Sequence, residues 1–303
     1  MVWVSFDLHQ HLWPEALLGV LARRTSAPRL LRDGSEWTLE LAGEPPSRIA
    51  LADHDPVRRA LEADRDGLDL VAIAPSLPLG IEALEPDEAQ PLLDAFHDGI
   101  LELGDPFRLW ASTSVPEAVE PLLDRGALGV CLPAAALSSE AALAGVADVL
   151  ATLERREAPV FVHPGPAAPA AAGIAWWPAL TAYVAEMNAA WHGWAAWGSS
   201  AHPGLKVLFA MLAGGAPLHA ERLAARGGPA AAVHDERTYF DVSSYGPRTV
   251  DAMLRVVGVD RLVHGSDRPV VEPPRLASLG PALLHALNRA NPARLLSLDP
   301  VVA

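Results

Sequence analysis

Short apolar runs alternate with amphipathic helical stretches along nearly the whole chain of 303 residues. This alternation is typical of a parallel sheet, because a helix must connect the end of one strand with the start of the next. We expect eight strands, over residues 3–8, 68–74, 107–113, 128–132, 159–163, 205–211, 238–243 and 261–266. They predict an α/β fold with a single (β/α)8 TIM barrel rather than an open, doubly wound sheet.

Helical segments fall between the strands, and several begin with the proline or serine that helix N-termini favour. We expect them over residues 86–103, 116–125, 139–156, 178–197, 217–226, 247–257 and 276–288. An irregular stretch, 14–66, follows the first strand and contains a hairpin-like segment at 37–41. The chain is therefore predicted to be one domain, 1–303, with an N-terminal insertion over 14–66 that forms a lid or a dimer contact.

Charge and composition exclude several classes of partner. The net charge of −14 argues against nucleic acid, whose binding proteins cluster Lys and Arg over phosphates. No apolar run reaches the roughly 20 residues of a membrane-spanning helix, so no membrane partner is expected. The N-terminus lacks the basic segment of a signal peptide, and Cys131, the one cysteine, cannot form an internal disulfide. We therefore expect a cytoplasmic protein that acts on a small molecule.

His9 and His11 come directly after the first predicted strand, with one residue between them. Side chains two apart on a strand point the same way, and the C-terminal strand ends of a parallel barrel form its active-site mouth. Two imidazoles placed there suit a metal ion. Alone the pattern is weak, because two surface histidines in a turn would also produce it.

Two later strands end in complementary groups. His163 ends the fifth predicted strand, and Asp267 follows the eighth. With His9 and His11 they would give three imidazoles and one carboxylate, open on one side. This set suits a single catalytic divalent ion, with Zn²⁺ favoured and Mn²⁺ the alternative, because a catalytic site keeps a position for water.

These motifs resemble the second amidohydrolase family, which includes aminocarboxymuconate-semialdehyde decarboxylase, resorcylate-type decarboxylases and carboxylate-lactone hydrolases. The matching segments are DLHQH at 7–11, VHP at 162–164, HPGLKV at 202–207, FDVS at 240–243, GSDRP at 265–269 and NPARLL at 291–296. They cover nearly the whole chain in the family's order. The resemblance implies a metal-dependent barrel enzyme with His9, His11, His163 and Asp267 as ligands, and Asp267 as a proton shuttle as well.

Strand six departs from the family, which usually ends this strand with a histidine before a glycine-rich turn. This chain has Met211 at that place, followed by Gly214 and Gly215. Methionine cannot shuttle protons, so the resemblance does not carry decarboxylation over cleanly. Met211 is either an apolar wall against the substrate or a core residue.

The one lysine, Lys206, bears on the number of metal ions. Binuclear relatives bridge two metals with a carboxylated lysine at the end of strand four. Lys206 instead begins strand six, and strand four contains Cys131, which we expect to be a buried structural residue. One metal ion is therefore predicted.

Three further residues are candidates for substrate binding. Arg268 follows the ligand aspartate, and Arg48, in the insertion, resembles a family position that binds a substrate carboxylate. Either arginine could instead form a surface salt bridge. His219, near the start of the helix predicted over 217–226, could reach the mouth. Asp241 and Ser243, on strand seven, either line the pocket floor or satisfy each other.

Five further histidines are expected on the surface or in loops: His54, His97, His202, His234 and His285. A helix rich in tryptophan contains Trp191, Trp194 and Trp197. Their spacing suggests packing within the fold or contact with a second subunit of a homodimer.

The leading functional hypothesis is a metal-dependent hydrolase, in which a metal-activated water attacks a small carboxylate-bearing lactone, amide or ester and Asp267 accepts its proton. The alternative is a non-oxidative decarboxylase of an aromatic or enol carboxylate, with another group replacing the missing histidine. A third hypothesis is a degenerate barrel that binds a metabolite without turnover. Met211 supports this third hypothesis, whereas the retention of all four expected ligands argues against it.

Overall fold

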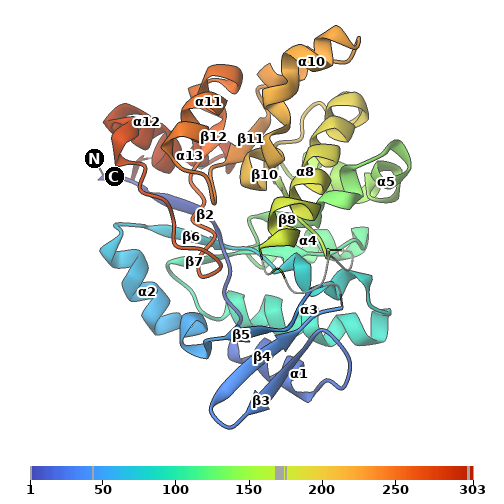
Figure 1. Cartoon of the computed structure of the whole chain (residues 1–303), viewed down its shortest axis with the longest axis vertical. Helices are drawn as coiled ribbons and strands as arrows, with labels where there is room; N and C mark the ends of the chain where they lie inside the picture. The colour runs from blue at the N-terminus through green and yellow to red at the C-terminus, as the bar shows by residue number, and fades with distance from the viewer. Residues whose placement is uncertain (1, 43, 168–173, 175, 299–300, 303) are drawn as a thin grey trace.

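The computed structural model describes residues 2–42, 44–167, 174, 176–298 and 301–302. Eight strands form one parallel sheet in which their order follows the order along the chain (Figure 1). The strands are β2 (Phe6–Gln10), β6 (Leu70–Ile73), β7 (Phe107–Ser112), β8 (Gly129–Pro133), β9 (Val160–His163), β10 (Val207–Phe209), β11 (Thr238–Asp241) and β12 (Leu262–Val263).

The sheet closes where β2 meets the segment that follows β12. The Asp267 amide donates a hydrogen bond to the His9 carbonyl (2.8 Å), and the His11 amide donates one to the Arg268 carbonyl (2.7 Å). The predicted (β/α)8 barrel is therefore confirmed. The closure also brings the first and last metal-ligand motifs of the sequence side by side.

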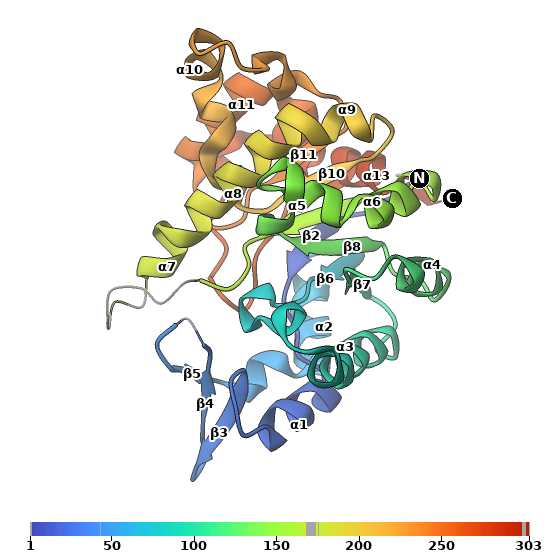
Figure 2. The same ribbon diagram turned by 90° about the vertical axis from the view of Figure 1, so that its right-hand side faces the viewer.

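Helices surround the sheet (Figures 1 and 2). They are α2 (Pro56–Arg65), α3 (Pro86–Leu101), α4 (Pro116–Asp124), α5 (Glu140–Gly145), α6 (Ala147–Arg155), α7 (Trp177–Leu180), α8 (Ala182–Gly193), α9 (Ser199–Ala201), α10 (Ala220–Ala225), α11 (Pro247–Val257), α12 (Pro281–His285) and α13 (Asn291–Leu295). Among these described helices, none combines the length and apolar character needed to cross a bilayer.

The stretch 14–66 contains three parts. Helix α1 (Glu15–Arg23) is followed by an antiparallel sheet of β3 (Arg29–Asp33), β4 (Glu36–Glu40) and β5 (Ser47–Ile49), and then by α2. The hairpin-like segment at 37–41 corresponds to β4, the central strand of this small sheet. Helix α2 belongs to the barrel, because it connects β2 with β6.

All eight predicted strands have somewhat different limits in the structure, and two of the differences have a clear cause. The first strand was expected over 3–8, but residues Val2–Trp3 form β1, which pairs with β13 (Val301–Val302) outside the barrel. The apolar pattern continues through the break between β1 and β2, so the sequence does not reveal it. The strand expected over 205–211 ends at Phe209, because the chain turns sharply after it.

This turn, η6 (Ala210–His219), has an unusual backbone. Residues 211–215 all have left-handed φ angles, of 53°, 50°, 53°, 60° and 79°. Met211, Leu212 and Ala213 each bear a cost of roughly 1–2 kcal/mol for this conformation. Burial of Leu212 and Ala213 in the core offsets part of it. The segment is thus held in place by its surroundings.

Three histidines expected on the surface or in loops, His54, His97 and His202, are in fact buried, which corrects the sequence prediction. The Trp13 amide donates to Nδ1 of His54 (3.1 Å), and the Ser112 amide donates to Nε2 of His97 (3.0 Å). Burial lowers the pKa of both imidazoles to about 4, so both are neutral acceptors. A long-range bond from a backbone amide leaves no periodic signal in the sequence.

We predict that Gly214→Ala lowers the free energy of unfolding by about 2–4 kcal/mol. The alanine would have to adopt a left-handed backbone conformation, and its methyl group would overlap a neighbouring carbonyl group. Its Cβ would lie 2.5 Å from the Val184 carbonyl oxygen. Gly215→Ala is the matched control, since its φ is also positive but its Cβ would lie 3.8 Å from the nearest atom, in Leu218. Urea unfolding followed by tryptophan fluorescence measures both. Equal losses would contradict the proposed overlap.

Candidate metal centre

Three buried histidines converge at the C-terminal ends of β2 and β9. His9 lies in β2, His11 follows it directly, and His163 is the last residue of β9. One ring nitrogen from each lies within 4.8 Å of the other two. The ring centroids of His163 are 5.0 Å from those of His9 and 5.2 Å from those of His11. The structure thus brings together three of the four expected ligands from separate strands.

The tautomer of each imidazole follows from its partner on the other nitrogen. Each Nδ1 faces an oxygen that only accepts: Asp241 Oδ2 for His9 (2.7 Å), the Ala74 carbonyl for His11 (3.1 Å) and the Pro164 carbonyl for His163 (2.9 Å). Nδ1 therefore carries the hydrogen in all three rings. Nε2 is left with a free lone pair, which is the arrangement of metal-binding histidines.

The donor set fits a divalent cation. Nε2 of His9 lies 3.2 Å from Nε2 of His11. Two lone pairs at this distance repel each other unless a positive charge lies between them. Nitrogens that bind one ion at about 2.0–2.1 Å are separated by roughly this distance, so both rings are placed as ligands of one ion.

Asp267 lies beside the histidines and is the fourth candidate ligand. Its Oδ1 is 3.6 Å from Nε2 of His9 and 3.3 Å from Nε2 of His11, and Ser244 Oγ donates to its Oδ2 (3.3 Å). Burial raises the pKa of Asp267, but the adjacent imidazole of His11, with those of His9 and His163, outweighs it and lowers the pKa to about 2. Its carboxylate is therefore ionised at neutral pH and available to a cation.

When no metal ion is bound, a proton on His9 compensates part of the negative charge of the neighbouring carboxylates. Burial lowers the pKa of His9, but the adjacent Asp241, with Asp267 and Asp7, reverses this and raises it to about 9. Burial and the other two imidazoles keep the pKa of His163 well below its usual value. The centre therefore attracts positive charge, which a metal supplies in place of the proton.

Asp241 has a larger role than the sequence indicated. Besides His9, it accepts hydrogen bonds through Oδ1 from the amide of Met211 (2.9 Å) and the amide of Ser243 (3.0 Å). It is fully buried. Asp241 thus orients a metal ligand and also holds the first residue of the left-handed turn, a supporting contact that typically matters for metal affinity.

Arg59, on α2, was missed in the sequence. Its buried guanidinium donates to the His11 carbonyl (2.9 Å), to the side chain of Gln10 and to the Arg268 carbonyl (3.5 Å). Asp7 accepts from the Gln10 amide group (2.7 Å) on the same side. These groups lie behind the ligands and fix the backbone that carries them. No local pattern marks Arg59, because its partners lie in distant segments.

The other expected substrate-binding residues occupy different places. Met211 is half-buried and packs against the core beside Asp241. The side chain of Arg48, on β5, is 79% exposed and pairs with Glu36 (3.0 Å). His219 is exposed at the end of η6. In the described part of the chain, neither Arg48 nor His219 forms a hydrogen bond or ion pair with the three histidines.

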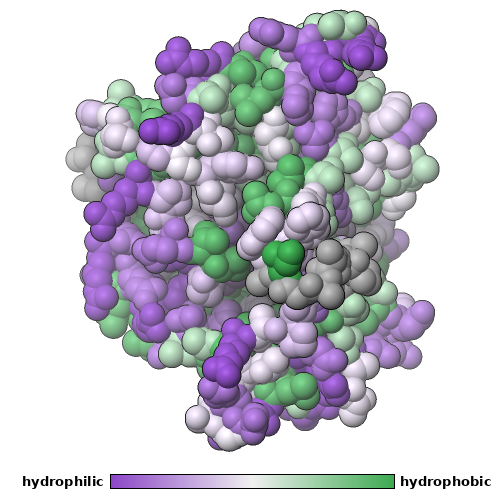
Figure 3. Space-filling model, viewed as in Figure 1, coloured by the Kyte–Doolittle hydropathy of each residue, from purple (hydrophilic) through white to green (hydrophobic). Residues whose placement is uncertain are grey.

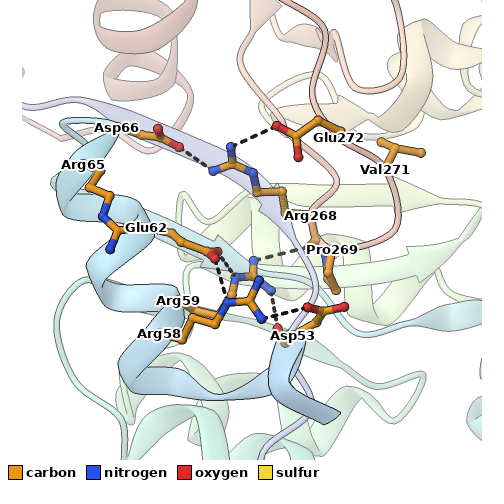
Figure 4. Close-up of a pocket in the computed structure, with 10 residues that line it drawn as sticks. All are labelled: Asp53, Arg58, Arg59, Glu62, Arg65, Asp66, Arg268, Pro269, Val271 and Glu272. Atoms are coloured by element: carbon orange, nitrogen blue, oxygen red, sulfur yellow. Dashed lines mark hydrogen bonds and ion pairs between the residues drawn. The ribbon is translucent and has the colours of Figure 1, made fainter. Parts of the chain in front are cut away.

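Arg268 points into a cavity of about 420 Å³ between α2 and the segment after the barrel closure (Figure 4). The guanidinium pairs with Asp66 and lies 3.8 Å from Glu272. The charged side chains of the cavity are Asp53, Arg58, Arg59, Glu62, Arg65, Asp66, Arg268 and Glu272. Positive and negative groups balance, and the three histidines are not among the lining residues. Arg268 thus lies on the opposite side of the backbone from Asp267.

Comparison with known proteins addresses the fold. No protein-family model and no curated protein sequence matches the chain. Solved structures match over nearly its whole length, among them the apo form of IDCase from Metarhizium anisopliae (19% identity, TM-score 0.75, 98% of both chains). An amidohydrolase II also matches (18% identity, TM-score 0.72, 97% of this chain and 99% of that chain). The chain has the fold of these amidohydrolase-type barrels.

A third match is 5-carboxyvanillate decarboxylase from Novosphingobium aromaticivorans, in complex with manganese and 4-hydroxy-3-methoxy-5-nitrobenzoic acid. It is 12% identical, with a TM-score of 0.72, over 98% of this chain and 96% of that chain. At these identities the likeness establishes the barrel alone. One of the matching structures has the name of the family whose motifs the sequence resembles.

We predict that Asp241→Asn weakens Mn²⁺ and Zn²⁺ binding by about 10–100-fold, because the amide no longer fixes the Nδ1–H tautomer of His9. Titration calorimetry of the metal-free protein measures the affinity. Asp251→Asn is the control, since that carboxylate pairs with Arg255 on the exposed face of α11. Equal affinities in the two variants would exclude a supporting role for Asp241.

A second prediction concerns pH. A proton on His9 competes with the metal below its pKa of about 9. The apparent metal affinity should therefore rise with pH by up to about tenfold per unit from pH 7 and level off near pH 9. In Asp241→Asn the pKa of His9 falls, so the plateau should begin at lower pH. A wild-type affinity that is constant between pH 7 and 9 would refute this competition.

Proposed function

We propose that this protein is a metal-dependent decarboxylase of a hydroxylated aromatic carboxylate. The observation that carries the metal dependence is the set of three histidine nitrogens within 4.8 Å of one another beside an ionised Asp267. The matched barrels named as decarboxylases support the reaction class, and one of them holds manganese with a hydroxylated nitrobenzoate. The ion would be Mn²⁺ or Zn²⁺, held by His9, His11, His163 and Asp267.

A divalent ion held by these residues would supply a Lewis acid for the substrate. Asp267 moves the proton. Its ionised carboxylate accepts the proton of the substrate's ring hydroxyl and then delivers it to the ring carbon that bears the carboxylate. The bond between this carbon and the carboxylate breaks, its electron pair restores the aromatic ring, and carbon dioxide leaves. The product phenolate takes a proton from solvent on release.

An aromatic side chain packs against the histidine rings. The ring of Phe161 packs edge-on against His9, with centroids 5.0 Å apart, and lies 6.0 Å from His163. The face of the molecule in Figure 3 is hydrophilic along much of its rim, with hydrophobic residues nearer its centre. Phe161 is fully buried, so it packs against the imidazoles and supports them. Because Met211 has no exchangeable proton, proton transfer falls to Asp267.

Hydrolysis is the second candidate function, and the observation that favours it is Met211 in place of the family's histidine at strand six. The pKa of Asp267 is lowered to about 2, so its carboxylate is ionised at neutral pH and could accept the proton of a water activated by the metal. The substrate would then be a small lactone, amide or ester with a carboxylate. The same four candidate ligands would serve both reactions, so only a test of substrates from both classes can decide between them.

We expect the Mn²⁺- or Zn²⁺-loaded protein to release carbon dioxide from at least one member of a panel of hydroxybenzoates and 5-carboxyvanillate. Asp267→Asn should lower kcat by about 10²–10⁴-fold, because it removes the proton carrier, with Asp251→Asn as the surface control. Metal binding without carbon dioxide release, but with cleavage of lactones or esters, would establish the hydrolase instead. Failure to bind metal would leave only the metabolite-binding barrel.

A further inference from the structure

A polar pair joins the insertion to the helix layer. The hydroxyl of Tyr183, in the first turn of α8, donates a hydrogen bond to the carboxylate of Glu44, in the connection between β4 and β5. Figure 2 shows this connection and the start of α8 on the same side of the molecule, opposite the two termini. Tyr183 is half-buried. The pair therefore spans the side of the barrel on which the strands end.

One face of α8 packs on the loop that follows His163. Glu186 lies one turn after Tyr183, so the two side chains project from the same face of the helix. The Glu186 carboxylate accepts hydrogen bonds from the amides of Gly165 (2.9 Å) and Ala135 (3.1 Å). Because Gly165 is two residues beyond His163, this face of α8 lies beside the metal centre.

The first turn of α8 also touches the left-handed turn after β10. A Cβ at Gly214 would lie 2.5 Å from the carbonyl oxygen of Val184, the residue after Tyr183. The same turn begins with Met211, which Asp241 holds by its amide. The start of α8, which carries Tyr183, thus contacts both the loop after His163 and the left-handed turn that begins with Met211.

The hydroxyl is suited to accept a hydrogen bond. Burial, the bond to Glu44 and the charges of Glu44, Glu186 and Asp267 raise the pKa of Tyr183, so it stays protonated. The hydroxyl donates its hydrogen bond to Glu44, so the lone pairs of its oxygen can accept a hydrogen bond from another donor. The sulfur of Met211, at the start of the left-handed turn, is only a weak hydrogen-bond acceptor.

We propose that Tyr183, held by Glu44, is a specificity-determining residue that accepts a hydrogen bond from a ring hydroxyl of the substrate, across the mouth from Asp267. The inference rests on the proposed function, which supplies an aromatic carboxylate as ligand. The hydrogen bond to Tyr183 favours substrates with a second ring hydroxyl over those with hydrogen or methoxy at the same position. The pair also fixes the insertion as one wall of the mouth.

The test is binding to the Mn²⁺-loaded protein, which requires no turnover. Dissociation constants are measured by calorimetry for benzoate, 2,4-dihydroxybenzoate and 2,6-dihydroxybenzoate. Tyr183→Phe should weaken at least one dihydroxybenzoate by about 5–20-fold and change benzoate by less than about twofold, because one hydrogen bond is lost. Glu44→Gln should reduce the same preference, and the double variant should be no worse than Tyr183→Phe.

Tyr239→Phe is the matched control, since it also loses a phenolic hydroxyl but lies on β11 next to Arg261. It should bind all three ligands as the wild type does. The proposal is overturned if Tyr183→Phe and Glu44→Gln weaken benzoate as much as the dihydroxybenzoates, if neither changes any affinity, or if the wild type binds none of the three. Selective binding without carbon dioxide release would uphold Tyr183 and refute the decarboxylase.

Discussion

The hydrogen bonds that close the barrel are the interaction on which the rest of the site depends. The His9 carbonyl accepts from the Asp267 amide, and the His11 amide donates to the Arg268 carbonyl. Because backbone groups make these bonds, they set the positions of the ligands regardless of which side chains surround them. Arg59 strengthens the junction from outside by donating to two of its carbonyls. The closure of the barrel therefore brings together most of the candidate metal centre, and His163 joins it from β9.

Asp241 connects this junction to the least regular part of the fold. One oxygen orients His9, and the other holds the amide of Met211 at the start of a run of left-handed residues. Strained backbone of this kind persists where surrounding contacts determine it, and such places are often functional. The turn packs on α8, which carries Tyr183 to the mouth. A single buried carboxylate thus links a metal ligand, a strained turn and the proposed specificity residue.

Much of the fold and the ligand set could be read from the sequence, because both depend on local periodicity. The alternation of strands and helices, and polar residues placed at strand ends, predicted the barrel and the positions of His9, His163 and Asp267. Alternation along a strand would also have placed Arg268 on the opposite side from Asp267. Arg59 and the Tyr183–Glu44 bond could not be predicted, because each joins segments far apart in the chain and has no repeat to reveal it.

The position of the ligands at the two ends of the chain has a thermodynamic consequence. His9 and His11 come from the first barrel strand, and Asp267 comes from the segment after the last. An ion bound by all of them closes nearly the entire polypeptide into one loop, so part of its binding free energy opposes the chain entropy of the unfolded state. A bound metal ion would then stabilise the contact between the first and last strands of the barrel as well as take part in the reaction.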